Sequence, residues 1–310
     1  MILSTYKGRA VAPFKLHLQN SIDLEKSGRD PFTYKVFVMG GLLSDGKFIL
    51  GVIFALWRIC SEEETPNFVF GESLVEAGNY NYLVTLSKAN YLPHGIDLGK
   101  PTGRYTNGRT IIDIIGQTLG FKGFTPPYLA PTTSGPVILT GVNYASGGGG
   151  ILNEIGKVFV GRINLDAQID NFSNTREDIM STIGVPAALK LLEGALFSVT
   201  IGSNDFLNNY LAPVISEAER KLIPPETFVG ILIARLRLQI TLKILVAALN
   251  DLPGAKFVYA DVYSIVEDII ENYISYGFEN ANSACCRVAG RYGGLIPCGP
   301  QFSMVCEDRS

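Results

Sequence analysis

The sequence predicts an α/β protein built on a parallel sheet that helices cover on both faces. The first observation is a set of short apolar runs, at residues 67–70, 196–201 and 255–260, of the kind found in buried parallel strands. The second is that segments with helical character alternate with these runs. The helical segments are residues 74–86, 110–119, 187–192, 226–250 and 263–273.

The first strand leads into the first helical segment through a glycine. Asn67-Phe-Val-Phe70 runs into Gly71, and the polar segment 74–86 that follows has helical potential. Residues 90–110 are rich in Gly, Pro, Thr and Asn and predict a long loop. In residues 110–119 the isoleucines and a leucine recur on one helical face, which predicts a helix.

The second half repeats the alternation of strand and helix. A Pro-rich stretch at 125–136 predicts a loop, and the glycine run 147–150 leaves backbone amides accessible. Residues 187–192 predict a helix that leads into the strand 196–201. Residues 226–250 form a long segment whose apolar positions are spaced for burial on one helical face.

Composition excludes several classes of protein. Hydrophobic residues make up 47% and charged residues 18% of the 310 residues, which is typical of a folded globular chain rather than a disordered one. The net charge is −3 and no basic patch is visible, so we expect no nucleic-acid partner. No linker divides residues 66–310, which predicts one domain there. The oligomeric state is not determined by the sequence.

An apolar run at residues 48–57 lies in an N-terminal extension, residues 1–65. The run is too short to span a bilayer, and Lys47 and the polar residues after it give it the form of a signal-peptide core. Translation from Met39 would place it where such a core belongs, and the chain would then be secreted. The alternative is a buried strand or helix.

Cysteine usage and one sequon also fit an oxidising export route. Four of the five cysteines lie close together near the C-terminus. Their spacing differs from that of zinc sites, which favours two disulfides over a metal site and predicts no metal. Adjacent cysteines rarely pair, so Cys285 and Cys286 each reach one of Cys298 and Cys306 in this hypothesis. Asn171-Phe-Ser173 is a glycosylation sequon.

Polar residues follow two of the predicted strands. Ser73 comes directly after the first strand, where a helix start would expose its hydroxyl near backbone amides. A serine at this position is also an ordinary helix cap. Asn204 follows the strand 196–201, where its amide could donate into the same pocket, although Asn after Gly-Ser also forms turns. The glycines 147–150 let a backbone N–H approach an oxyanion, or simply form a turn.

These segments in this order closely resemble the plant form of the GDSL esterase/lipases, the SGNH hydrolases. The resemblance runs from about residue 66 to residue 310. It rests on residues 70–79, 101–110, 141–150, 200–210, 256–263 and the Cys285-Cys286 tail.

The resemblance implies a three-layer α/β/α fold and hydrolysis of carboxylic esters, with a small-molecule or lipid ester as substrate and no cofactor. It makes Ser73 the nucleophile. The Ser73 N–H, the Gly148 N–H and the Asn204 side chain would form the oxyanion hole, and Gly147 is the alternative to Gly148.

The sequence departs from the family pattern in two internal places. Glu72 stands where the family usually has Asp, and a shorter side chain bonds more readily to nearby amides, so we expect a less rigid turn here. The segment 240–249 joins one helix directly to a later one, where the family has a strand and a Pro-Ile-Gly-Cys-type turn. The loss of a strand would leave backbone groups unpaired.

The third departure concerns the general base. In the family an Asp-x-x-His block follows the position of Ser310, and its His takes the serine proton while its Asp orients the His. The chain contains only His17 and His94, and neither lies in such a block, so we find no catalytic Asp or His. His94, in a loop, is interpreted as structural or solvent-exposed.

Three hypotheses follow. The first is a serine ester hydrolase whose activity in these 310 residues is doubtful without the Asp and His. The second is a non-catalytic, truncated or spliced form that binds lipid or glycan. The third is a chain that does not fold stably, which cooperative thermal unfolding would contradict.

Overall fold

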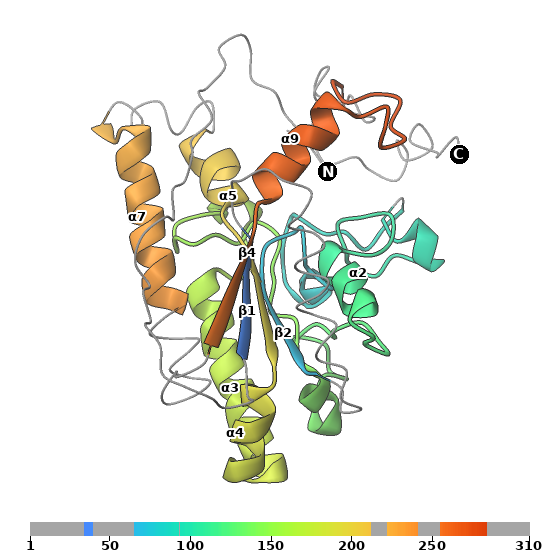
Figure 1. The fold of residues 1–310 in the computed structure, drawn as a ribbon, viewed down its shortest axis with the longest axis vertical. Helices are drawn as coiled ribbons and strands as arrows, with labels where there is room; N and C mark the ends of the chain where they lie inside the picture. Colours follow the sequence, from blue (N-terminus) through green and yellow to red (C-terminus); the bar gives the residue numbers. More distant parts are fainter. Residues whose placement is uncertain (1–33, 40–64, 93, 212–221, 241–254, 284–310) are drawn as a thin grey trace.

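The protein is a parallel α/β structure in which four strands form one sheet (Figure 1). The computed structural model describes residues 34–39, 65–92, 94–211, 222–240 and 255–283. All strand pairs are parallel and the order is β2-β3-β1-β4. The strands are β1 (Tyr34–Met39), β2 (Asn67–Gly71), β3 (Leu196–Thr200) and β4 (Ala255–Ala260).

Helices lie on both sides of this sheet, which gives the three-layer α/β/α arrangement (Figure 1). The α-helices are α2 (Ile111–Thr118), α3 (Leu165–Ile183), α4 (Val185–Glu193), α5 (Ser203–Asp205), α7 (Pro225–Leu238) and α9 (Val262–Glu271). Short 3-10 helices are η1 (Asn79–Tyr82), η2 (Ile96–Leu98), η3 (Gly135–Thr140) and η4 (Lys157–Phe159), and η5 (Phe206–Tyr210) is a π-helix.

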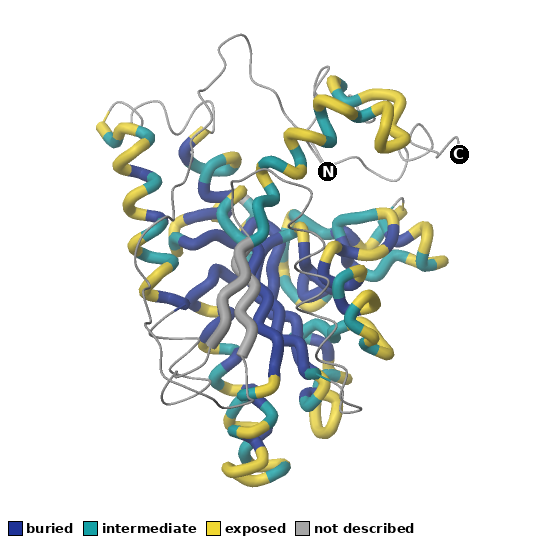
Figure 2. The backbone as a smooth tube through the Cα atoms, in the orientation of Figure 1, coloured by how far each residue is buried: buried dark blue, intermediate teal, exposed yellow. Residues whose placement is uncertain are grey.

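Strand β2 is buried on both faces because it packs against helices on each side (Figure 2). Phe68 and Phe70 point into a core shared with α3, where both rings contact Phe172. Val69 points the opposite way, toward Ile112 of α2. Successive side chains of a strand point to opposite faces, so a strand with apolar residues on both faces must be covered on both. This is why the sequence pattern predicts a parallel sheet between helices.

Most elements expected from the sequence are present. The expected strands correspond to β2, β3 and β4, and the helices at 110–119, 187–192 and 263–273 correspond to α2, α4 and α9. The long segment 226–250 begins as α7, and its part from 241 to 250 lies outside the described residues.

The helix expected at residues 74–86 is wrong. The chain makes a turn there and then only the short η1. Gly78 has φ 119°, and a Cβ on it would meet the Thr102 carbonyl oxygen at 2.5 Å, so the backbone leaves helical geometry. Ser73 therefore lies in a turn rather than at the start of a helix.

Strand β1 comes from the N-terminal extension and lies between β3 and β4. It pairs in parallel with β3 on one side and with β4 on the other. The division at residue 65 stays a prediction. The apolar run 48–57 and the cysteines lie outside the described residues.

Two absences concern the described residues alone. No helix among them is both long enough and apolar enough to cross a bilayer. The same part of the chain holds no group of His, Cys, Asp and Glu side chains placed to bind a metal ion.

Candidate active site

The carboxyl end of β2 turns sharply and presents Ser73 at the edge of the sheet. Glu72 N–H donates to the Thr200 carbonyl of β3 at 3.1 Å, and Val75 N–H donates to the Glu72 carbonyl at 3.1 Å, which closes the turn. Ser73 lies inside it and is half-buried. Within the described chain, neither its N–H nor its hydroxyl makes a hydrogen bond.

Gly71 allows β2 to approach β3 closely just before this turn. A Cβ at Gly71 would meet the Thr200 carbonyl oxygen at 2.2 Å, so no other residue fits there. The side chain of Gln168, in α3, accepts from Gly71 N–H and donates to Gly71 O, both at 2.8 Å. The same amide donates to Ile163 O at 2.7 Å. One buried carboxamide thus fixes the strand end to the segment before α3.

The glycine run lies against this turn, and its amides are almost all occupied. Gly147 N–H donates to the Glu76 carboxyl at 2.5 Å, Gly149 N–H to Ser146 O at 3.0 Å, and Gly150 N–H to the Asn164 side chain at 3.0 Å. The Gly148 N–H has no acceptor among the described residues, although Gly148 is buried. A buried amide without a partner is uncommon and marks a place for a ligand atom.

Asn204 connects the turn that contains Ser73 with the glycine run 147–150. Its Nδ2 donates to Gly149 O at 2.9 Å and to Glu72 Oε2 at 3.3 Å, and its backbone N–H also lies 3.3 Å from Glu72 Oε2. Its Oδ1 accepts from Asn208 Nδ2 at 2.6 Å, which fixes the orientation of the carboxamide. Asn204 is therefore bonded to the residue before Ser73 and to the residue after Gly148.

Glu72, whose turn was expected to be less rigid than one with Asp, connects β2 with α5. Besides Asn204, its carboxyl accepts from the Ser203 hydroxyl. The longer side chain thus reaches across to the next loop instead of bonding within its own turn.

Three buried carboxyl groups surround the site, and burial raises the pKa of each. The pKa of Glu72 is raised to about 7 by burial, which hydrogen bonds from Ser203 and Asn204 oppose. The pKa of Glu76 is raised to about 8 by burial, and that of Asp205 to about 6. Asp205 accepts from Ile151 N–H at 2.9 Å and Leu152 N–H at 3.1 Å. At neutral pH Glu76 is thus mostly uncharged, which limits the negative charge that would oppose an oxyanion.

His94 packs among tyrosines. Its Nδ1 lies 3.1 Å from the Tyr91 carbonyl oxygen, and its ring meets those of Tyr91 and Tyr105 edge-on. Burial lowers its pKa. No contact joins it to Ser73 within the described chain.

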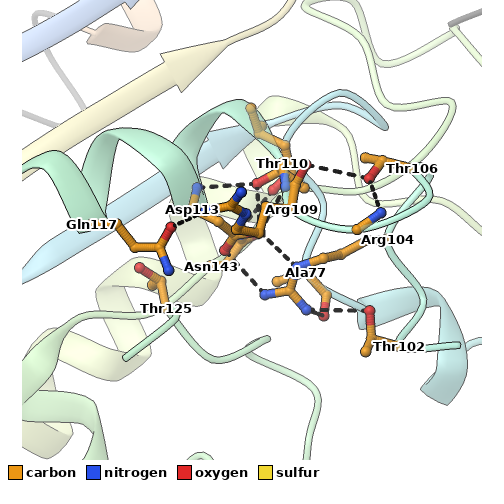
Figure 3. Close-up of polar contacts among 12 residues, drawn as sticks. Ala77, Thr102, Arg104, Thr106, Arg109, Thr110, Asp113, Gln117, Thr125 and Asn143 are labelled. Atoms are coloured by element: carbon orange, nitrogen blue, oxygen red, sulfur yellow. Dashed lines mark hydrogen bonds and ion pairs between the residues drawn. The ribbon is translucent and has the colours of Figure 1, made fainter. Parts of the chain in front are cut away.

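Residues of the loop 101–110 form a network of polar contacts with the start of α2 and with Ala77 (Figure 3). Arg104 is buried and donates twice to Asp113, from Nε at 2.7 Å and from Nη2 at 3.1 Å. Asp113 also accepts from Thr110 N–H at 2.8 Å, and Thr110 caps α2 in return. Arg104 Nη1 is 3.5 Å from Ala77 O, so this network reaches the segment that follows Ser73.

The structure thus gathers the segments of Ser73, Gly148 and Asn204 at one edge of the sheet. The sequence did not point to Glu76, Asp205 and Gln168, because the site partners Gly147, Ile151 and Gly71 lie 71, 54 and 97 residues away along the chain. Their acidic or amide character within otherwise apolar surroundings is the one signal that could have pointed to them.

The GDSL-like lipase/acylhydrolase family model matches residues 68–239, which include all three of these segments. The chain belongs to this family. Its members are serine ester hydrolases, which agrees with a serine and unpaired amides at the carboxyl end of a parallel strand.

Several Arabidopsis thaliana members are similar to this GDSL chain over most of its length. GDSL esterase/lipase At4g16230 is 51% identical, with 84% of this chain and 85% of the relative covered. GDSL esterase/lipase At3g50400 is 45% identical, over 79% of this chain and 80% of the relative. GDSL esterase/lipase At2g23540 is 43% identical, over 78% and 77%. No solved structure matches the chain.

Proposed function

We propose that Ser73 is the nucleophile of a carboxylic ester hydrolase and that the Ser73 N–H, the Gly148 N–H and the Asn204 carboxamide bind the oxyanion. The observation that carries the proposal is the position of Asn204, which bonds both to Glu72 and to Gly149. These two bonds link Asn204 to the residue before Ser73 and to the residue after Gly148, which supports a shared site. The N–H groups of Ser73 and Gly148 are without partners in the described chain, while Gly147 N–H is held by Glu76. This favours Gly148 over Gly147.

The Asn204 carboxamide has to change one bond when a substrate binds. Its bond to Gly149 O is 2.9 Å and the one to Glu72 is 3.3 Å, so the longer one is the weaker. A developing oxyanion replaces Glu72 as acceptor of that N–H. The bond to Gly149 keeps the carboxamide in place meanwhile.

The reaction proceeds in two steps. Ser73 Oγ attacks the ester carbonyl carbon while a general base takes the serine proton. The tetrahedral intermediate then collapses and expels the alcohol, which receives that proton from the base. Water then attacks the acyl-enzyme in the same manner and releases the acid. The base is the His of an Asp-x-x-His segment, which the family resemblance supplies and these 310 residues do not contain.

The test is hydrolysis of a short-chain p-nitrophenyl ester. We compare the 310-residue chain with the same chain extended through an Asp-x-x-His segment, each with and without Ser73→Ala. We expect the extended chain to be faster by about 10³-fold or more, and Ser73→Ala to abolish that gain. Equal rates with and without the segment would show that the base is assigned wrongly. Unchanged activity in Ser73→Ala would rule out the nucleophile.

A second candidate function is binding of lipid or glycan without turnover. The observation that favours it is that His94, among the described residues, is hydrogen-bonded to Tyr91 O and not to Ser73. If the 310-residue chain turned over an ester and Ser73→Ala stopped it, this candidate would be rejected.

We also propose that the chain enters the secretory pathway through the run 48–57, with two disulfides in its cysteine-rich tail. The sequon fits this route, since Asn171 is half-buried on α3 and its side chain is partly accessible. Cleavage after the run would remove β1 as well, so cleavage and a mature sheet that contains β1 exclude each other. N-terminal sequencing of the secreted protein decides: a mature end before Met39 contradicts cleavage here.

A further inference from the structure

The end of η1 and the segment after it expose apolar side chains where polar ones are expected. Tyr82, Val84 and Leu86 alternate along the chain and all face solvent, with Val84 87% and Leu86 72% exposed. The residues between them are the half-buried Leu83 and Thr85. Large apolar side chains grouped on the surface of one short segment mark a contact surface for a ligand or partner, unlike single exposed ones.

A second exposed apolar residue lies in a strained backbone conformation. Val160 has φ 70° and ψ −82° and is the one non-glycine residue with positive φ in the described chain. For a β-branched residue this conformation is unfavourable by roughly 1–3 kcal/mol, and such residues gather at ligand sites. Its side chain is 61% exposed. The fold thus holds an apolar side chain toward solvent in spite of strain.

These two segments pack against each other. Leu86 N–H donates to the Phe159 carbonyl at 3.1 Å, and the Thr85 hydroxyl donates to the same oxygen at 3.0 Å. A Cβ on Gly161 would meet the Val84 carbonyl oxygen at 2.2 Å, so the backbones of 84 and 161 are in close contact. Val84, Leu86 and Val160 therefore lie on neighbouring segments; we call these three residues the apolar lip.

The apolar lip is connected to the oxyanion glycine through a single aromatic ring. A Cβ at Gly148 would lie 2.4 Å from Phe159 Cδ2, so the Phe159 ring covers Gly148 directly. Phe159 precedes Val160 and accepts the hydrogen bond from Leu86. From the unpaired Gly148 N–H, the path over Phe159 leads to the apolar lip.

We propose that the apolar lip binds the acyl chain of the ester substrate and selects acyl groups long enough to reach it. The inference rests on the proposed function, because it places the ester carbonyl oxygen at the Gly148 N–H. From that point the acyl chain continues across Phe159 to Val84, Leu86 and Val160. A hydrocarbon chain has no hydrogen-bonding groups and matches a surface whose three side chains have none. Lys157, three residues before Val160, pairs with Glu154, and Arg162, two residues after it, donates to the Ile155 and Asn153 carbonyl oxygens.

The test measures binding rather than turnover, so it does not depend on a catalytic base. Dodecanoate, kept below its critical micelle concentration, is titrated into the full chain by calorimetry. We expect wild type to bind it, and the Val84→Ser/Leu86→Ser double variant to bind it about tenfold more weakly or worse, because both side chains lose apolar contact. The control is Val185→Ser at the start of α4, another exposed valine (52%) at the opposite end of the sheet, which should leave the affinity unchanged.

Several results would overturn the inference. They are no binding by wild type, equal weakening by Val185→Ser, and self-association that the double variant abolishes, which would make the patch an interface between copies of the chain. The proposed function can fail separately. Dodecanoate binding without hydrolysis by the extended chain would reject the hydrolase mechanism and keep the acyl site. Hydrolysis by the extended chain, with the same acyl-length preference in wild type and double variant, would keep the hydrolase mechanism and reject the acyl site.

Val160→Gly separates a binding role from a packing role. Glycine tolerates this φ and ψ, so the variant should unfold at the same or a higher temperature than wild type. It lacks the side chain, so it should bind dodecanoate severalfold more weakly. A lower melting temperature together with unchanged affinity would show that Val160 serves the fold alone.

Discussion

At the scale of single residues, the carboxyl group of Glu72 makes the stability of the fold depend on pH. Burial raises its pKa from 4.5 to about 7, so the folded chain holds this proton more tightly than the unfolded chain does. The stability that results is complete below pH 4.5 and is lost as the pH rises through 7. Glu72→Gln removes this titration and keeps an oxygen that accepts from Asn204; its NH2 group faces Ser203, whose hydroxyl, now a donor to Glu72, can accept instead.

We therefore expect Glu72→Gln to gain stability relative to wild type as the pH rises. Between pH 4.5 and pH 7.5 the difference in unfolding free energy should change by roughly 3 kcal/mol in favour of the variant. Urea unfolding at several pH values measures it. Glu177→Gln, on the exposed face of α3, is the matched control and should stay within about 0.5 kcal/mol of wild type. A constant difference between Glu72→Gln and wild type would contradict the buried, protonated carboxyl.

Single residues also show what the sequence could predict of the site. Ser73, Gly148 and Asn204 each lie in a segment with its own local signature, a strand end, a glycine run or a strand end followed by polar residues, so they could be named in advance. Glu76 has no such signature, because its role depends on reaching Gly147 N–H, 71 residues away. Glu72 could be recognised as unusual, but its reach to Ser203 and Asn204 required the sheet.

At the scale of elements, the start of α2 depends on a buried ion pair. Arg104 and Asp113 have side chains 7% and 5% exposed, and the carboxylate also caps the helix through Thr110 (Figure 3). Removal of one partner leaves the other charge buried, which costs about 3–5 kcal/mol. We expect Arg104→Ala to lower the free energy of unfolding by this amount in chemical denaturation.

Arg109→Ala is the matched control from the same loop. Arg109 is exposed and donates to Gln117 at 2.7 Å, so its loss should change stability by no more than about 0.5 kcal/mol. The same loss in both variants would mean that burial of the Arg104–Asp113 pair does not matter.

Elements were predictable where their pattern was local. β2 and β3 are uniformly buried, and Thr110 caps the start of α2 reciprocally with Asp113, so sequence and structure agree there. The sequence did not predict α3, because the polar residues Gln168 and Thr175 occupy buried positions on its apolar face. They interrupt the helical spacing of hydrophobic residues. The helix prediction for residues 74–86 was wrong because Glu76 and Asn79 bond to backbone groups of residues 143–147, and no local sequence pattern shows those bonds.

At the scale of the whole molecule, β1 decides whether β4 belongs to the sheet. β1 pairs with β3 on one side and with β4 on the other, and all six residues of β4 are in register with it. β4 has no other strand partner among the described residues. Among the described strands, the N-terminal β1 is therefore the one that joins β4, and the α9 that follows it, to the rest of the sheet.

A chain that begins at Met39 tests this arrangement. Without residues 34–38, the amides of β4 lose their acceptors, and we expect hydrogen exchange in residues 255–260 to accelerate by roughly tenfold or more. β2 is the internal control, because its partners are β3 and the backbone of 142–144, and its exchange should hardly change. Unchanged protection of β4 would mean that β1 is dispensable, and secretion with cleavage after residue 57 would then leave a complete sheet. Faster exchange in β4 alone would instead mean that β4 needs the N-terminal strand, and that cleavage after residue 57 would leave β4 outside a sheet that is otherwise intact.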